Sequence, residues 1–149
     1  MPRSMGLQGH PLGAYASAAT PVGTTITPIA GLSVPLPTAG KWRIEGWIPL
    51  VVVGLPTGFT LTLVGSASTS SMRVLVRRSD ATSSWTDSYL TTLGSASTSS
   101  SLTAQTYLFN IDGAADIVGN GTVSVSMTRT GGTSATTQVG SFLIATRID

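Results

Sequence analysis

Apolar residues recur at every second position in short runs along this chain, and this alternation constrains the fold more than any other feature. In the longest run one side of an extended backbone carries Trp42, Ile44, Gly46, Ile48 and Leu50, and the other side carries Lys41, Arg43, Glu45 and Trp47. Because successive side chains of a strand point to opposite faces, this period of two predicts a strand with one buried face. The runs 72–78 and 123–128 alternate in the same way, which is typical of half-buried antiparallel strands.

Clusters of Gly, Pro and Ser separate these runs at the spacing typical of a sandwich or barrel. The predicted strands are 24–29, 31–36, 41–53, 58–64, 72–78, 85–92, 105–111, 121–129 and 137–148. Pro49 indicates an edge or a bulge within its run, because proline cannot donate a ladder hydrogen bond. We therefore predict an all-β fold, an antiparallel, jelly-roll-like β-sandwich of about eight strands.

The charged residues are too few for a helical protein. The chain has one lysine, Lys41, and one glutamate, Glu45, so long helices supported by Glu–Lys pairs are excluded. Lys and Arg number 8 and Asp and Glu number 6 in 149 residues, well below the roughly 25% charged content of ordinary soluble domains. A weakly charged surface favours association, so the composition indicates a protein that assembles.

The length and net charge limit the number of domains and the kind of partner. A chain of 149 residues fits one domain of ordinary size. The pI of about 9.5 results from few carboxylates, and a net charge of only +2 gives little support to nucleic-acid binding. No run reaches the roughly 18 apolar residues of a membrane span, and the first residues lack the apolar stretch of a signal peptide. We expect synthesis in a cytoplasm and assembly there.

Residues 1–23 are rich in proline and glycine and show no helix or strand period. This composition predicts an extended N-terminal arm, with the β-sandwich domain over 24–149. Free termini of this kind are usually poorly ordered unless something holds them, so we expect a neighbouring subunit to grip the arm.

Two short motifs lie between the predicted strands. Asn120-Gly121 falls between apolar runs and predicts a tight type I′ turn, whose positive φ angles this dipeptide accepts. The segment GSASTSS occurs twice, at 65–71 and at 94–100. We interpret the two copies as flexible loops; the alternative is a pair of equivalent loops at the same end of a sandwich. A single pair of copies does not establish a solenoid.

The sequence offers little for catalysis or for metal binding. Cysteine is absent, which excludes disulfides, thiolate zinc sites and thiol chemistry. His10 is the only histidine and lies in the predicted arm, so a Ser-His-Asp triad has no base and a histidine-rich zinc site has no ligands. Lys41 follows Gly40 without the spacing of a phosphate-binding loop. We expect no enzyme activity, no cofactor and no metal.

The aspartates form two pairs that are close in sequence. Asp112 and Asp116 are four residues apart, and Asp80 and Asp87 flank a Ser/Thr-rich stretch. Either pair could perform the acid–base chemistry of a glycosidase. We interpret them instead as solvated carboxylates in turns. Calcium binding has no support from a twelve-residue D-x-D-x-D-G loop.

Two of the three tryptophans and a cluster of three arginines are candidates for an interface. The alternation places Trp42 in the core, whereas Trp47 and Trp85 remain candidates for an interface or a flat ligand such as a sugar. Arg73, Arg77 and Arg78 form a small basic cluster that either meets acidic residues of a partner or is simply solvated; the complete set of candidate partner-binding residues is Arg3, Met5, Leu7, His10, Leu12, Tyr15, Trp47, Trp85, Arg77 and Arg78.

The run GLSVPLPTAGKWRIEGWIPLVVVGLPTGFTLTLVG resembles a β-rich domain found in structural proteins of tailed bacteriophages. The shared pattern is a V/P-rich strand, an A-G turn, an aromatic-R-x-E strand and a T-G turn into L-x-L-x-G. The segments GTVSVSMTR and VGSFLIATRI are similar as well, so the resemblance covers most of residues 24–149.

The resemblance implies a virion component that binds other virion subunits and forms a homo-oligomer, by analogy a trimer. Among virion roles we favour a capsid decoration, or cement, protein bound to the major capsid protein, with no nucleic acid and no membrane as partner. The alternative is a tail-fibre, head-spike or tail-tip module that binds host glycans through Trp47, Trp85 and the two GSASTSS copies.

Overall fold

The computed structural model describes residues 10–54, 57–79, 85–102, 105–132 and 134–149, with only the backbone described for residues 57, 85–86 and 98–102. These residues form strands and connecting turns, and they contain no helix that could cross a membrane. The prediction of an all-β, antiparallel, jelly-roll-like sandwich is confirmed.

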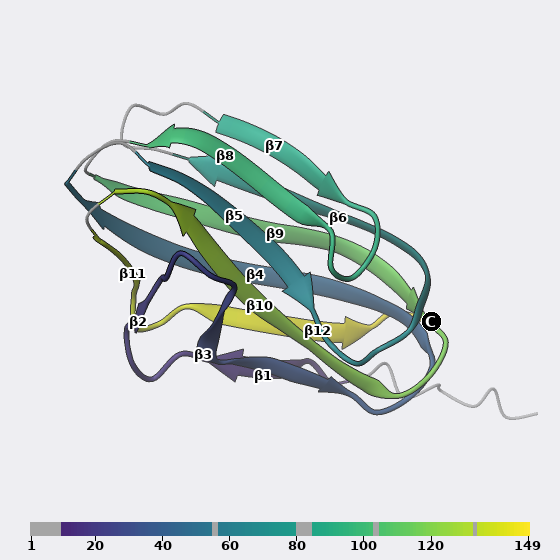
Figure 1. Ribbon diagram of the computed structural model, residues 1–149. Helices are drawn as coiled ribbons and strands as arrows, with labels where there is room; N and C mark the ends of the chain where they lie inside the picture. Colours follow the sequence, from purple (N-terminus) through teal and green to yellow (C-terminus); the bar gives the residue numbers. More distant parts are fainter. Residues whose placement is uncertain (1–9, 55–56, 80–84, 103–104, 133) are drawn as a thin grey trace, which may run out of the picture.

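The described residues form twelve strands in two sheets (Figure 1). In chain order the strands are β1 (Leu12–Tyr15), β2 (Thr20–Pro21), β3 (Thr27–Leu36), β4 (Gly40–Val53), β5 (Thr57–Val64), β6 (Thr69–Ser79), β7 (Trp85–Leu90), β8 (Ala96–Leu102), β9 (Thr106–Ile117), β10 (Gly121–Thr130), β11 (Ser134–Thr137) and β12 (Phe142–Arg147). The large sheet has the order β1-β12-β4-β9-β6-β7, with β2 and β11 attached beside β4, and the small sheet has the order β3-β10-β5-β8.

The strand pairs are nested, as in one long hairpin that has been rolled up. β6 pairs with β7, β5 with β8, β4 with β9, β3 with β10, β2 with β11 and β1 with β12. Over much of the chain the paired residues are equally far from one central point of the sequence. Ile44 lies opposite Gly113, Val34 opposite Val123, and Leu12 opposite Ala145. The sheets β3-β10-β5-β8 and β4-β9-β6-β7 therefore form an eight-stranded jelly roll.

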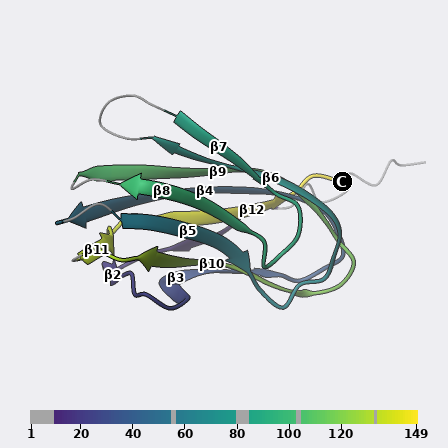
Figure 2. The same ribbon diagram turned by 45° about the horizontal axis from the view of Figure 1, so that its top comes forward.

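The core lies between the two sheets, which Figure 2 shows stacked, with β4 and β9 above β5 and β10. The small sheet contributes Phe59, Leu61, Leu63, Val123, Val125 and Met127, and the large sheet contributes Trp42, Ile44, Ile48, Val74, Tyr107 and Phe109, all buried. Those from residues 41–50, 72–78 and 123–128 come from the alternating positions that the sequence predicts. Burial of a side chain of this size stabilises a fold by about 1.5–3 kcal/mol, so this alternation fixes the sandwich.

The expectation of an extended arm over residues 1–23 differs from the structure over its second half. β1 pairs with β12 and buries Ala14, and β2 pairs with β11. The segment directly after β2 is held in place by the Arg129 side chain, whose Nε donates to the carbonyl oxygen of Val22 at 2.9 Å. Residues 12–23 are part of the sandwich, and residues 1–9 lie outside the described residues.

The two GSASTSS copies are not loops along their whole length. Residues 69–71 of the first copy belong to β6, and residues 96–100 of the second belong to β8. Residues 96–100 form a strand because they pair with β5, and their hydroxyl side chains are compatible with strand geometry. The local sequence does not reveal this pairing partner. The copies begin at the same end of the sandwich, where Gly94 N donates to the carbonyl oxygen of Leu63 at 2.7 Å.

Two turn predictions also differ from the structure. Residues 118–120 cross from β9 in the large sheet to β10 in the small sheet, and Gly121 begins β10 without a positive φ, so no type I′ hairpin forms. Pro49 lies in a central strand and not at an edge. The Pro49 carbonyl accepts a hydrogen bond from Gln138 N at 3.0 Å. The Pro49 nitrogen, which has no hydrogen to donate, lies on the same side of the strand. It therefore faces the turn between β11 and β12, where the partner ladder is interrupted.

Candidate functional site on the large sheet

The candidate site is the solvent side of the large sheet, formed by the outward side chains of β1, β12, β4, β9, β6 and β7. We call it the large-sheet face. On β4 the outward residues are the alternate set Lys41, Arg43, Glu45 and Trp47, as the sequence predicts. The register then places Asn110 and Asp112 of β9 directly beside Trp47 and Glu45.

Three aromatic rings lie in register across neighbouring strands of this face. Tyr15 on β1 is opposite Phe142 on β12, and Phe142 is opposite Trp47 on β4. The Tyr15 and Phe142 ring centroids are 6.2 Å apart with the rings tilted by 42°, a favourable aromatic contact. Tyr15 is 62% exposed and Trp47 is 43% exposed. We call these three residues the aromatic stripe.

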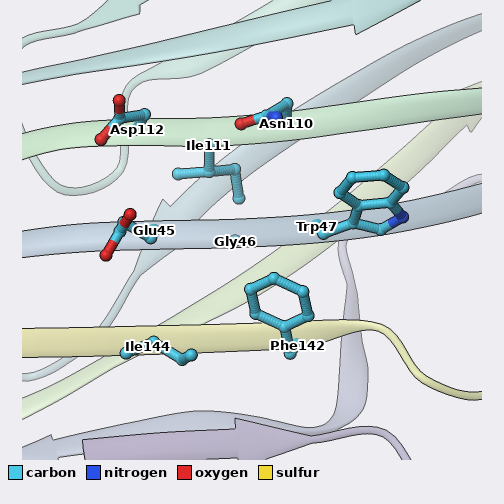
Figure 3. Close-up of a pocket in the computed structure, with 8 residues that line it drawn as sticks. All are labelled: Glu45, Gly46, Trp47, Asn110, Ile111, Asp112, Phe142 and Ile144. Carbon is cyan, nitrogen blue, oxygen red and sulfur yellow. The ribbon is translucent and has the colours of Figure 1, made fainter. Parts of the chain in front are cut away.

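A shallow hollow of about 390 Å³ lies beside the stripe. Figure 3 shows Trp47 on β4 next to Phe142 on β12, with Asn110 and Asp112 on β9 along the opposite wall. Ile144 and Glu45 complete the far end. Apolar rings along one wall and amide and carboxylate groups along the other suit a protein side chain or a sugar ring.

Ion pairs join the charged residues of β4 to those of β9. The Arg43 guanidinium lies 3.2 Å from the Glu45 carboxylate and 3.3 Å from the Asp112 carboxylate. Hydrogen bonding to Asp112 raises the pKa of Arg43, and the negative charges of Asp112 and Glu45 add to the effect. Lys41 lies 3.9 Å from Asp116, which also accepts a hydrogen bond from the Ser71 hydroxyl.

The β6–β7 hairpin carries the second group of charges on this face. Arg77 Nε donates to Asp87 at 2.8 Å, and Arg77 Nη2 donates to the other carboxylate oxygen at 3.0 Å. This bidentate contact raises the pKa of Arg77 and lowers the pKa of the Asp87 carboxyl, in each case mainly through the side-chain hydrogen bond. The Arg73 guanidinium lies 4.6 Å from the Tyr89 ring centroid, a cation–π contact.

The structure brings together only part of the predicted interface set. Tyr15, Trp47 and Arg77 share the large-sheet face. Leu12 packs against the core, and Arg78 points to the other side of β6, 5.9 Å from the ring centroid of buried Tyr107. His10 is exposed just before β1; Arg3, Met5, Leu7 and the Trp85 side chain lie outside the described residues.

The carboxylates are arranged differently from the predicted pairs. Asp112 and Asp116 are both on β9, not in a turn, and four residues of strand separate their Cα atoms by about 13 Å. Asp87 is on β7 and is paired with Arg77, whereas Asp80 lies outside the described residues. No group of three or more possible metal ligands occurs in the part of the chain that the structure describes.

Sequence reasoning missed Asn110, Phe142, Ile144 and the contact between Glu45 and Asp112. Glu45 and Asp112 lie opposite each other in the ladder although 67 residues separate them in the chain (112 minus 45). Alternation places each on a solvent face, but the register of two distant strands determines that they meet. The alternate positions of the run 142–147 would have identified Phe142 and Ile144 as exposed apolar residues.

The opposite side of the sandwich has a different character. Outward side chains of the described part of β3, β5 and β10 are small and uncharged: Ser33, Pro35, Thr60, Val64, Thr122, Ser124 and Thr128. We call this the small-sheet face. Large aromatic side chains and ion pairs are therefore concentrated on the other face.

No protein-family model and no curated protein matches this sequence. Among solved structures, the chain is similar to the module TmCBM61 in complex with β-1,4-galactotriose, with a TM-score of 0.47, 7% identity, and 83% of this chain and 89% of that chain covered. It is also similar to the Eiger TNF of S. frugiperda, with a TM-score of 0.47, 12% identity and coverage of 93% and 92%. Likeness at this level concerns the fold alone.

Proposed function

We propose that this chain is a non-enzymatic structural protein of a virion, a capsid decoration or cement protein that binds the assembled shell and stabilises it. In this proposal it is assembled in the host cytoplasm, acts as a homo-oligomer, by analogy a trimer, and has the major capsid protein or other virion subunits as partners. The proposal combines the sequence resemblance with one structural observation, the composition of the large-sheet face.

The aromatic residues and arginines of the large-sheet face are residue types that protein interfaces favour. Interface cores are enriched in Tyr, Trp, Phe and Arg and depleted in Lys, Glu and Asp. This face presents Tyr15, Trp47, Phe142 and Tyr89, and its guanidinium groups come from Arg43, Arg73 and Arg77. Its carboxylates are engaged in ion pairs with neighbouring strands, which suits a contact surface better than a site that turns over a substrate.

A decoration protein stabilises a shell by mass action. If the chain binds only assembled subunits, each occupied site adds about 2.7 kcal/mol when the free protein is at 100 times its dissociation constant. The sandwich supplies this binding with rigid sheet surfaces, so little conformational entropy is lost on association. No chemical step is required of any residue.

The test is the rupture temperature of particles that lack this chain, before and after the purified protein is added. The proposal expects the rupture temperature to rise in a saturable way with added protein. Equal rupture temperatures with and without the protein would contradict the proposal.

The hollow beside Trp47 favours glycan binding as a second candidate function. An exposed indole beside Asn110 and Asp112 combines an apolar platform with hydrogen-bonding groups, as sugar recognition requires. A glycan array with the isolated protein tests this, with Trp47→Ser and the core-neutral Ile26→Ser as a matched pair. Binding that is lost in the first variant and kept in the second supports a host-adhesion module; absence of binding to any glycan removes it.

A further inference from the structure

We infer that the aromatic stripe of Tyr15, Phe142 and Trp47 is where copies of this chain contact one another. The inference rests on the proposed function, since it assigns the homo-oligomer contact to a particular part of the large-sheet face. The occupant proposed for the stripe is a second copy of this chain and not a capsid protein or a sugar.

The stripe is an exposed apolar surface that a solitary subunit has no reason to keep. Three aromatic side chains lie side by side on β1, β12 and β4, and Ile144 extends the surface by one row. Tyr15 is 62% exposed and Trp47 is 43% exposed, whereas the aromatic residues of the core are almost completely buried. Contiguous exposed apolar groups with polar groups around them mark interaction sites.

The charges of the large-sheet face cancel, which suits a second copy of this chain as partner. The cationic residues are Lys41, Arg43, Arg73 and Arg77, and the carboxylates are Glu45, Asp87, Asp112 and Asp116. Four positive and four negative groups leave no net charge on the described face. A second copy therefore meets no net repulsion, whereas a strongly charged partner gains no net attraction.

The size of the face matches what a stable contact needs. Six strands at a spacing of about 4.8 Å span roughly 24 Å, and ten residues of strand span roughly 34 Å. The resulting planar area of about 800 Å² equals the surface that each partner buries in a typical stable interface. The aromatic half over β1, β12 and β4 then forms the dry centre, and the ion-paired half over β9, β6 and β7 forms the polar rim.

The test compares two pairs of variants by light scattering after size-exclusion chromatography at about 10 μM, a concentration that populates oligomers of ordinary affinity. Trp47→Ser and Tyr15→Ser change the stripe. Ile26→Ser and Val118→Ser remove side chains that are 66% and 58% exposed but lie outside the face, so they are matched controls for lost surface hydrophobicity. Circular dichroism confirms that each variant is folded.

We expect the unaltered chain to be an oligomer, each stripe variant to raise the dissociation constant at least tenfold, and both controls to leave it unchanged. A monomeric unaltered chain, or oligomers that survive both stripe variants, would overturn the inference. An oligomer that fails to raise the rupture temperature of particles contradicts only the decoration role. A monomer that raises it contradicts the self-contact and the homo-oligomer, but not the decoration role.

Discussion

Replacement of Trp42 by alanine should destabilise the fold strongly. Replacement of Trp47, five residues away on the same strand, should be tolerated. Trp42 is 3% exposed, and its indole N–H donates to the carbonyl oxygen of Thr38 at 3.2 Å. Removal of a buried tryptophan leaves a cavity and an unpaired carbonyl, with a cost of about 3–5 kcal/mol. Domains have about 5–15 kcal/mol of stability, so this cost is a large part of the total.

Urea unfolding followed by far-ultraviolet circular dichroism measures the loss. Trp42→Ala should lower the free energy of unfolding by about 3–5 kcal/mol, and the melting temperature by roughly 10 °C. Trp47→Ala should change the unfolding of the monomer by less than about 1 kcal/mol, because its ring is 43% exposed. Unfolding at two protein concentrations separates this loss from dissociation of an oligomer.

The contrast between the two tryptophans depends on the alternation of β4. A cost below about 1 kcal/mol for Trp42→Ala would refute the reasoning, because it would mean that the indole does not fill the space between the sheets. An equal cost for both variants at every protein concentration would refute it as well.

Other predictions follow from the termini, the glycines and the ion pairs. Deletion of residues 1–20 removes β1 and should give an unfolded or insoluble chain; a stable 1–20 deletion would be contrary to this. Gly113→Ala should cost about 2 kcal/mol or more in urea unfolding, because its Cβ would meet the backbone of Arg73 and Val74, whereas Gly119→Ala should be nearly neutral, since nothing lies within 4 Å. Asp87 has a lowered pKa in the folded chain, so its contribution to stability is present above the unfolded value of about 3.9 and is lost as the pH falls through the folded value. The difference in unfolding free energy between the unaltered chain and Asp87→Asn should therefore be constant between about pH 5 and 7 and shrink below about pH 4; a difference that grows on acidification would count against the Arg77–Asp87 pair.

Local alternation predicts which face of a strand is buried, and little else is needed for that. Trp42 and Ile44 are buried and Trp47 is exposed, as the period of two in residues 41–50 indicates. Met72, Val74 and Val76 follow the same rule on β6. The prediction fails for Ser126, which is buried where the alternation places it toward solvent.

Strands that lack large apolar residues carry no such signal. β1 has the sequence LGAY, in which Ala14 is buried but adds little hydrophobicity, so composition indicated an arm. β8 has the sequence ASTSSSL and is a strand because it pairs with the edge of β5. For these segments, pairing with a distant strand determines the structure. The sequence of the segment itself does not reveal which strand that is.

The candidate site depends on long-range register more than the fold class does. Trp47 was a sequence candidate because of its parity, and the structure adds Tyr15 and Phe142 as neighbours from strands at opposite ends of the chain. The ion pair between Arg43 and Asp112 joins residues 69 positions apart. Such contacts follow from the nested strand pairing, which has no local signature in the sequence.

The most direct measurement of the central claim is hydroxyl-radical footprinting of the purified chain in solution, with oxidation of each aromatic residue quantified by mass spectrometry. Trp47 and Tyr15 should be protected in the unaltered chain, although a single subunit leaves them 43% and 62% exposed, and they should become reactive in the Phe142→Ser variant. Tyr89, 55% exposed on the rim, should change less. Full reactivity of Trp47 and Tyr15 in the unaltered chain would rule out the self-contact, because the aromatic stripe would then be open to water and no copy would cover it.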